Sequence, residues 1–199
     1  MDPFDLVVVG GGAAGFMTAV TAAENGVKRI IILEGSSKLM EKVRISGGGR
    51  CNVTNASWIP SELAENYPRG GIKLLESFNR FAAGDVFDWF EKRGLNLKIE
   101  ADNRVFPVSD SSLDVISCLK KNAINKGVEI STKFFVKEIF KTSDNLFNII
   151  NSEKISIIAK NIILSTGGHP SGHKLAKNFG HSIITVSYTH LTLPTTPYV

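Results

Sequence analysis

The stretch that decides the fold runs from Asp5 to Glu34 and reads DLVVVGGGAAGFMTAVTAAENGVKRIIILE. Asp5 to Val9 and Arg29 to Glu34 are short apolar runs, which are typical of buried strands. Between them, Ala13 to Asn25 is rich in alanine and ends at Gly26, so it predicts a helix. Two strands joined by one helix within about 30 residues form a right-handed βαβ unit whose strands are parallel.

A glycine motif lies between the first predicted strand and the helix, at Gly10, Gly11, Gly12, Ala13, Ala14 and Gly15. In such a motif Gly10 permits the tight turn, Gly12 lets backbone N–H groups approach a pyrophosphate, and Gly15 lets the helix pack on the strand. The helix N-terminus adds about half a positive charge there. Glu34 follows Gly15 by 19 residues, where a carboxylate can bind an adenosine ribose and repel a 2′-phosphate. The segment predicts a Rossmann-like dinucleotide site, for NAD or for FAD.

A second glycine cluster discriminates between these two dinucleotides. Ser46-Gly47-Gly48-Gly49-Arg50-Cys51-Asn52 follows the second strand and is preceded by Lys42 and Arg44. An extended FAD needs a further main-chain surface for its pyrophosphate and flavin end, and glycines let backbone amides approach closely. The alternative is a flexible exposed loop, but a linker has no need of Arg50, Cys51 and Asn52 in tandem. We therefore expect this cluster to contact a cofactor.

A third element, Asn161 to Gly168, is an apolar strand that ends in Thr-Gly-Gly. Strand-like segments precede it at Glu129 to Thr132, Phe134 to Phe140, Phe147 to Asn151 and Ile155 to Ala159. This order predicts a sheet strand, a small antiparallel meander and a return to the parallel sheet. The alternative for the third element alone is a strand followed by an ordinary turn.

Helices are predicted between and after these strands. Leu74, Leu75, Phe78, Phe81 and Ala82 recur at helical spacing. Asp85 is a candidate cap for the next short helix, and Ser111 begins a capping box before a helix over Ser112 to Lys126. A further helix is expected over Lys174 to Gly180.

Composition limits the remaining possibilities. The 199 residues carry a net charge of +4, spread along the chain, which permits nucleic-acid binding without indicating it. Two distant cysteines match neither a disulfide framework nor a zinc site, and His169, His173 and His181 have no accompanying carboxylate, so we expect no metal. No apolar run approaches the length of a membrane span. A soluble protein of the reducing cytoplasm is the expectation.

With the three glycine elements in order, the chain resembles the BaiN/RdsA-like family of NAD(P)/FAD-dependent oxidoreductases, also described as aminoacetone-oxidase-like flavoproteins. The resemblance covers about residues 4–185. It is carried by the segments VVVGGGAAGFMTAV, KVRISGGGRCNVTNA, NRVFPVSDSSLDV, NIILSTGG and KLAKNFGHSI. It implies a Rossmann-like FAD-binding domain of the glutathione-reductase type, an α/β fold with a parallel sheet and an antiparallel β-meander insertion.

The resemblance also implies which residues contact FAD. Gly10 to Gly15 would hold the pyrophosphate and Glu34 the ribose, Val136 would meet the adenine through its backbone, and Phe106 and Pro107 would shape an entrance for substrate. The cofactor-binding residues so predicted are Gly10, Gly11, Gly12, Ala13, Ala14, Gly15, Glu34, Lys42, Gly47, Gly48, Arg50, Cys51, Asn52, Val136, Thr166, Gly167 and Gly168.

The domain organisation expected is an FAD-binding domain over 1–168 with a helical insertion at about 58–110. Residues 169–186 would begin a truncated substrate domain. Residues 187–199, SYTHLTLPTTPYV, resemble translated adaptor sequence and would be a non-native tail. Because family members use a later segment beside the flavin, no catalytic residue is assigned. His-Pro-Ser-Gly-His after Gly168 is also shorter than the version in many relatives, which leaves the substrate side undefined.

The reaction that the resemblance implies is reduction of the flavin by NAD(P)H, followed by hydride delivery to an unsaturated small molecule or to oxygen. Two alternatives stay open. The chain could be an incomplete nucleotide-binding module without turnover, or its parent could modify ribosomal RNA. The substrate, the choice between NADH and NADPH and the oligomeric state are not predicted.

Overall fold

A four-stranded parallel sheet organises the molecule. The computed structural model describes residues 2–68 and 70–184. The strands of the sheet are β1 (Leu6–Val9), β2 (Ile30–Leu33), β6 (Glu129–Ser131) and β10 (Ile162–Leu164), in the order β10-β1-β2-β6. Helix α1 (Ala13–Glu24) connects β1 to β2. The predicted βαβ unit and the return of a late strand to the parallel sheet are confirmed.

Both faces of this sheet are covered, which explains why its first two strands read as unbroken apolar runs. Alternate residues point to opposite faces. Val8 belongs to a buried cluster with Phe16 of α1 and Leu119 of α6 (Ser112–Asn125). Val7 belongs to a second cluster, with Ile149 of the antiparallel sheet.

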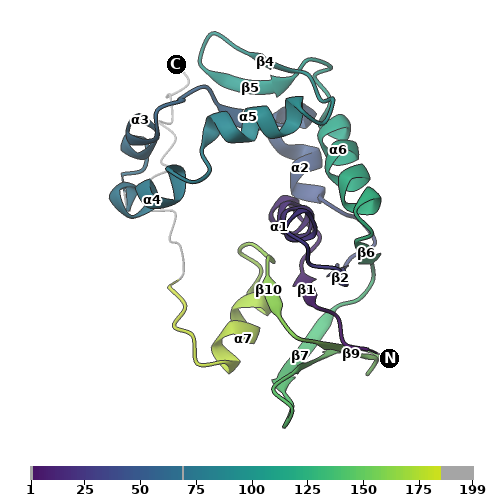
Figure 1. Ribbon diagram of the computed structural model, residues 1–199. Helices are drawn as coiled ribbons and strands as arrows, with labels where there is room; N and C mark the ends of the chain where they lie inside the picture. The colour runs from purple at the N-terminus through teal and green to yellow at the C-terminus, as the bar shows by residue number, and fades with distance from the viewer. Residues whose placement is uncertain (1, 69, 185–199) are drawn as a thin grey trace, which may run out of the picture.

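The antiparallel sheet is the predicted meander. It consists of β7 (Val136–Lys141), β8 (Phe147–Asn151) and β9 (Ser156–Ala159), paired in the order β7-β8-β9. Figure 1 shows it at the lower side of the molecule, near β10 and α7 (Pro170–Asn178). The expected fold class, a Rossmann-like α/β fold with a parallel sheet and antiparallel strands, is confirmed.

The chain between β2 and α6 forms a second structural layer, at the top of Figure 1. Its elements are α2 (Glu41–Ile45), the 3₁₀ turn η1 (Ser46–Gly49), β3 (Thr54–Asn55), α3 (Pro60–Glu65), α4 (Gly71–Phe78), α5 (Ala83–Glu91), β4 (Leu97–Ile99) and β5 (Arg104–Pro107). The last two strands and β3 pair antiparallel in the order β3-β5-β4. This small sheet was not predicted, since strands of two to four residues are too short to show a period.

Three local predictions need correction. Helix α4 ends at Phe78, so Phe81 and Ala82 lie beyond it. Asp85 is not the N-cap of α5 but lies inside its first turn, where its Oδ2 accepts a hydrogen bond from the Ala82 N–H at 2.8 Å. Helix α7 begins four residues earlier than expected, because Pro170 suits a first helical position and His169 caps it.

The predicted non-native tail lies outside the described residues. In the described part of the chain, no helix is long and apolar enough to cross a membrane.

Candidate nucleotide site

The strand order places a crevice at one end of the parallel sheet. Strand β1 has β2 on one side and β10 on the other, so the connections that leave β1 and β10 diverge at their carboxyl ends. In open α/β sheets, ligands bind at such a switch point. The glycine motif follows β1 at this point, and Ser165 to Gly168 follow β10.

The glycine turn is built by two close backbone approaches. Gly10 has φ of +114°, and a Cβ there would lie 2.6 Å from the Ser165 carbonyl oxygen. A Cβ on Gly15 would lie 2.0 Å from the Gly10 carbonyl oxygen. The Ser165 Oγ hydroxyl lies 3.0 Å from the Val9 carbonyl oxygen and 2.9 Å from that of Gly10. Gly10 and Gly15 therefore shape the turn, and Gly15 has a structural rather than a ligand-facing position.

Gly12 has a different role, because it faces open space. A Cβ at this position would have no heavy atom within 4 Å. Gly12 is also the N-cap of α1, which has no side-chain cap and no acidic residue in its first turn. The positive end of a 12-residue helix is therefore free to bind an anion.

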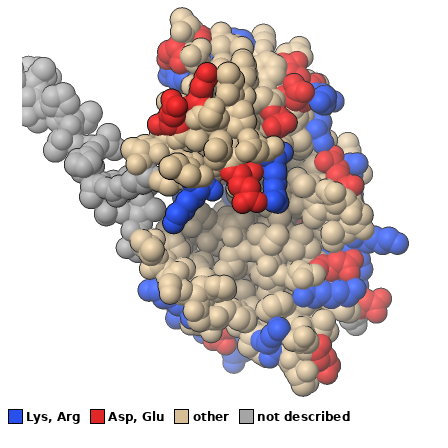
Figure 2. Space-filling model, turned by 60° about the vertical axis from the view of Figure 1, so that its left-hand side comes forward, with Lys and Arg blue, Asp and Glu red and all other residues tan. Residues whose placement is uncertain are grey.

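A cavity of about 610 Å³ lies in front of this helix terminus. It brings together residues of the glycine motif, of the turn after β2, of α2 and of the segment that ends β10. The lining consists of Gly10, Gly11, Gly12, Ala13, Ala14, Glu34, Ser36, Lys38, Met40, Glu41, Lys42, Val43, Leu164, Ser165, Thr166 and Gly167. Figure 2 shows a hollow on one face of the molecule with side chains of both charges at its rim.

Glu34 is held in place by two backbone groups. Its Oε2 accepts a hydrogen bond from the Gly11 N–H at 2.8 Å, and its Oε1 accepts one from the Ser36 N–H at 2.8 Å. Each carboxylate oxygen retains a further lone pair. The carboxylate can thus still accept hydrogen bonds from a diol such as a ribose.

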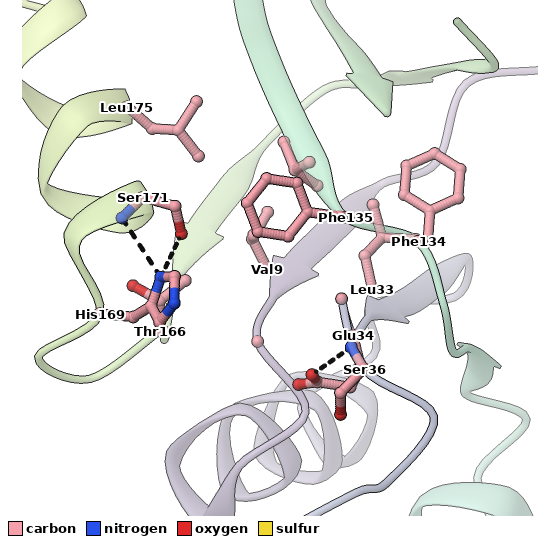
Figure 3. Close-up of a pocket in the computed structure, with 13 residues that line it drawn as sticks. Val9, Leu33, Glu34, Ser36, Phe134, Phe135, Thr166, His169, Ser171 and Leu175 are labelled. Carbon is pink, nitrogen blue, oxygen red and sulfur yellow. Dashed lines mark hydrogen bonds between the residues drawn. The ribbon is translucent and has the colours of Figure 1, made fainter. Parts of the chain in front are cut away.

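A second cavity, of about 400 Å³, continues from Gly10, Glu34 and Thr166. Figure 3 shows Glu34 and Ser36 at one side of it and Thr166, His169 and Ser171 at the other. Apolar side chains form the wall between them. These are Val9, Leu33, Phe134, Phe135, Val136 and Leu175. An apolar slot with polar groups at its rim suits a flat heteroaromatic base.

A third cavity, of about 430 Å³, lies on the opposite side of the pyrophosphate site, with which it shares Ala13, Lys42 and Val43. Cys51 and Asn52 line it, as do apolar side chains of α1, α5 and α6. Cys51 is a free thiol, and burial raises its pKa above the ordinary value. That direction disfavours the thiolate, so Cys51 has the character of a packed side chain rather than a nucleophile.

Within the second glycine cluster, Gly47 and Arg50 contact the β4–β5 hairpin. A Cβ on Gly47 would lie 3.0 Å from the Phe106 ring, so this glycine gives room to an aromatic side chain. Gly48 faces open space. Neither of the two, nor Arg50, lines the three cavities described above. Their contact with a cofactor stays a prediction.

Arg50 links the glycine cluster to the β4–β5 hairpin. Its guanidinium lies 4.0 Å from the centroid of the Phe106 ring and 2.6 Å from a carboxylate oxygen of Glu100. Asp110 lies 3.4 Å away. Hydrogen bonds from Lys98 and Arg50 lower the pKa of Asp110. The expected entrance role of Phe106 and Pro107 is wrong, because both side chains are fully buried.

We expect Arg50→Ala to lower the melting temperature of the chain by a few degrees, because it removes a stacked cation and its ion pairs. The segment 46–53 should also become more sensitive to limited proteolysis. Arg50→Lys should restore only part of the loss, since lysine lacks the planar fork. An unchanged melting curve for the alanine variant would show that these contacts of Arg50 do not stabilise the fold.

Some residues at the site were missed by the sequence reading. Ser36 and Lys38 line the pyrophosphate cavity, and Phe134 and His169 line the base cavity. The short Gly-Ser-Ser-Lys turn directly after Glu34 was the available signal for the first two. Among the residues that the structure describes, no group of three His, Cys, Asp or Glu could hold a metal ion.

The fold and this crevice define a dinucleotide-binding protein of the Rossmann class. The chain belongs to the HI0933-like protein Rossmann domain family, whose profile matches residues 4–193. This confirms the family that the sequence resembles, that of the BaiN/RdsA-like FAD oxidoreductases.

Curated relatives agree with this placement, and a solved structure shares the fold. The chain is 29% identical, over 188 residues, to a 3-dehydro-bile acid delta(4,6)-reductase of Clostridium scindens, covering 90% of this chain and 44% of the relative. It is 25% identical to the ribosomal RNA dihydrouridine synthase of Escherichia coli, covering 92% and 46%. The crystal structure of Thermovibrio ammonificans THI4 superposes with a TM-score of 0.62 at 12% identity, covering 90% and 64%. The chain thus spans under half the length of these curated relatives.

Proposed function

We propose that FAD binds along the three adjoining cavities and that the chain is the FAD-binding part of an oxidoreductase. The proposal rests on the order in which the three cavities adjoin one another. The base cavity shares Gly10, Glu34 and Thr166 with the pyrophosphate cavity, which in turn shares Lys42 with the apolar cavity beside Cys51. An elongated ligand with an adenosine at one end and a flat apolar ring at the other fits this sequence of surfaces.

Each part of the groove has a defined task in this proposal. The Gly12 end of α1 binds the pyrophosphate, and Lys42 adds a positive charge beside Gly167. Glu34 accepts hydrogen bonds from the ribose hydroxyls, and the backbone of Val136 meets the adenine. Asn52 and Cys51 border the flavin end, and Thr166 to Gly168 close the groove.

Bound FAD would supply reversible two-electron chemistry, and the protein would bind and orient it. We propose NAD(P)H as electron donor, with an unsaturated small molecule or oxygen as acceptor. The name of the Clostridium scindens relative, a reductase of an unsaturated bile acid, supports this reading. We further propose a cytoplasmic protein whose FAD-binding domain spans 1–168, with the insertion at about 58–110. Residues 169–186 are proposed as the start of a substrate domain, and its first helix also lines the base cavity through His169, Ser171 and Leu175.

A second candidate function is modification of ribosomal RNA, and it is favoured by the name of the Escherichia coli relative. Salt-dependent binding of ribosomal RNA would favour it, since phosphate contacts weaken as salt rises. If the protein does not bind ribosomal RNA even at low salt, the small-molecule reaction is favoured.

The primary test is titration of the purified chain with FAD, followed by flavin fluorescence and absorbance. We expect saturable binding at 1:1 stoichiometry and a perturbed flavin spectrum, because the ring enters a less polar surrounding. Bleaching of the bound flavin by NADH or NADPH then tests electron transfer. Binding without bleaching would identify a nucleotide-binding module without turnover. A chain that does not bind FAD would contradict the proposal.

A further inference from the structure

His169 has two ring nitrogens in different surroundings. It is the N-cap of α7, where its Nδ1 accepts a hydrogen bond from the Ser171 N–H at 3.2 Å. The Ser171 hydroxyl also lies 2.7 Å from Nδ1. Because Nδ1 serves as the acceptor of the cap, the neutral imidazole carries its proton on Nε2. The cap therefore fixes the tautomer of the ring.

The His169 ring is exposed at the rim of the base cavity. His169 lines that cavity together with Ser171, across from Glu34 (Figure 3). Within residues 2–68 and 70–184, Nε2 has no hydrogen-bond partner. The neighbouring walls are apolar, with Phe135 and Leu175 among them. A donor at the rim of an apolar slot is suited to the edge of a ring whose nitrogens are acceptors.

We propose that His169 is a specificity-determining residue for the adenine of the bound dinucleotide, to which its Nε2–H donates a hydrogen bond. The inference rests on the proposed function, because it takes the base cavity as the adenine site. Adenine presents only acceptors at its three unsubstituted ring nitrogens, so one imidazole N–H can pair with any of them. Glu34 and His169 then hold the adenosine from two sides, one accepting from the ribose and one donating to the base.

Two amide variants separate recognition of the base from capping of the helix. The amide oxygen of asparagine can take the place of Nδ1, so His169→Asn keeps a cap and loses the distal donor. His169→Gln carries an amide N–H at the distance of Nε2 but is a poor cap. We expect His169→Asn to weaken binding of both FAD and ADP by about five- to tenfold and His169→Gln to bind both within about twofold of the wild type. His173→Gln, on the same helix and outside the cavity, should leave both affinities unchanged.

Each outcome bears on a definite part of the argument. If His169→Asn binds FAD and ADP as tightly as the wild type does, His169 serves only as a helix cap. That result would overturn this inference and leave the proposed function standing. Loss in His169→Gln but not in His169→Asn would do the same, with helix content by circular dichroism as the accompanying measurement. A loss confined to FAD, with ADP unaffected, would also overturn it. A wild-type chain that binds neither ligand would overturn the proposed function and this inference with it.

Discussion

Gly15→Ala should lower the free energy of unfolding by about 3 kcal/mol or more and abolish dinucleotide binding. The added Cβ would lie 2.0 Å from the Gly10 carbonyl oxygen, which is backbone and has no free rotation to give way. Helix α1 would have to move away from β1, and the turn between them would open. Urea denaturation and FAD titration of the same preparation measure the two effects.

Gly12→Ala is the matched control for this substitution. It adds the same methyl group one turn earlier, where no atom lies within 4 Å and φ is −89°. We expect its free energy of unfolding to change by less than about 1 kcal/mol. FAD affinity should nevertheless fall at least about tenfold, because the methyl group enters the space of the phosphates. Similar denaturation curves for the two variants would refute the packing argument.

Glu34→Gln should weaken FAD binding by about a hundredfold, because two ribose hydroxyls lose their charged acceptor. The amide also places an N–H₂ group against either the Gly11 or the Ser36 N–H, where donor meets donor. We therefore expect a loss of about 1–2 kcal/mol in stability as well. Isothermal titration with FAD and urea denaturation together measure both consequences.

Glu41→Gln is the control, since Glu41 lines the same cavity but pairs with Arg44 at the surface. It removes the same charge without touching the proposed ribose position. FAD affinity should stay within about twofold of the wild type. If both variants lose affinity equally, the loss does not come from the ribose position and the role assigned to Glu34 is wrong.

The core of the fold could be predicted because its signals are local and strong. The first two strands of the parallel sheet are apolar on both faces, and α6 has Ser111 as its N-cap, whose side chain accepts a hydrogen bond from the Leu113 N–H. The meander could be predicted because β7, β8 and β9 follow one another with short turns. In each case neighbouring residues determine the element.

The rest depends on partners far apart in sequence. Arg50 contacts Glu100 and Asp110, which lie 50 and 60 residues away. The sequence of the glycine cluster does not indicate that it pairs with that hairpin. Histidine is an unusual N-cap residue, so the start of α7 at Pro170 could not be predicted from the sequence. His169 is exposed, and the helix start places it at the rim of the base cavity, which no pattern in the sequence indicated.

The contact between Gly47 and the Phe106 ring has a consequence for how this protein can change. Gly47 has φ of +56°, and a Cβ there would lie 2.9 Å from the Asn52 backbone nitrogen as well as 3.0 Å from the Phe106 ring, so a smaller residue at 106 would not by itself admit a side chain at 47. The glycine cluster is therefore fixed in conformation by the chain that follows it and by a hairpin more than fifty positions further along. In a library randomised at both positions, we expect surviving variants to keep glycine at 47 whichever residue stands at 106.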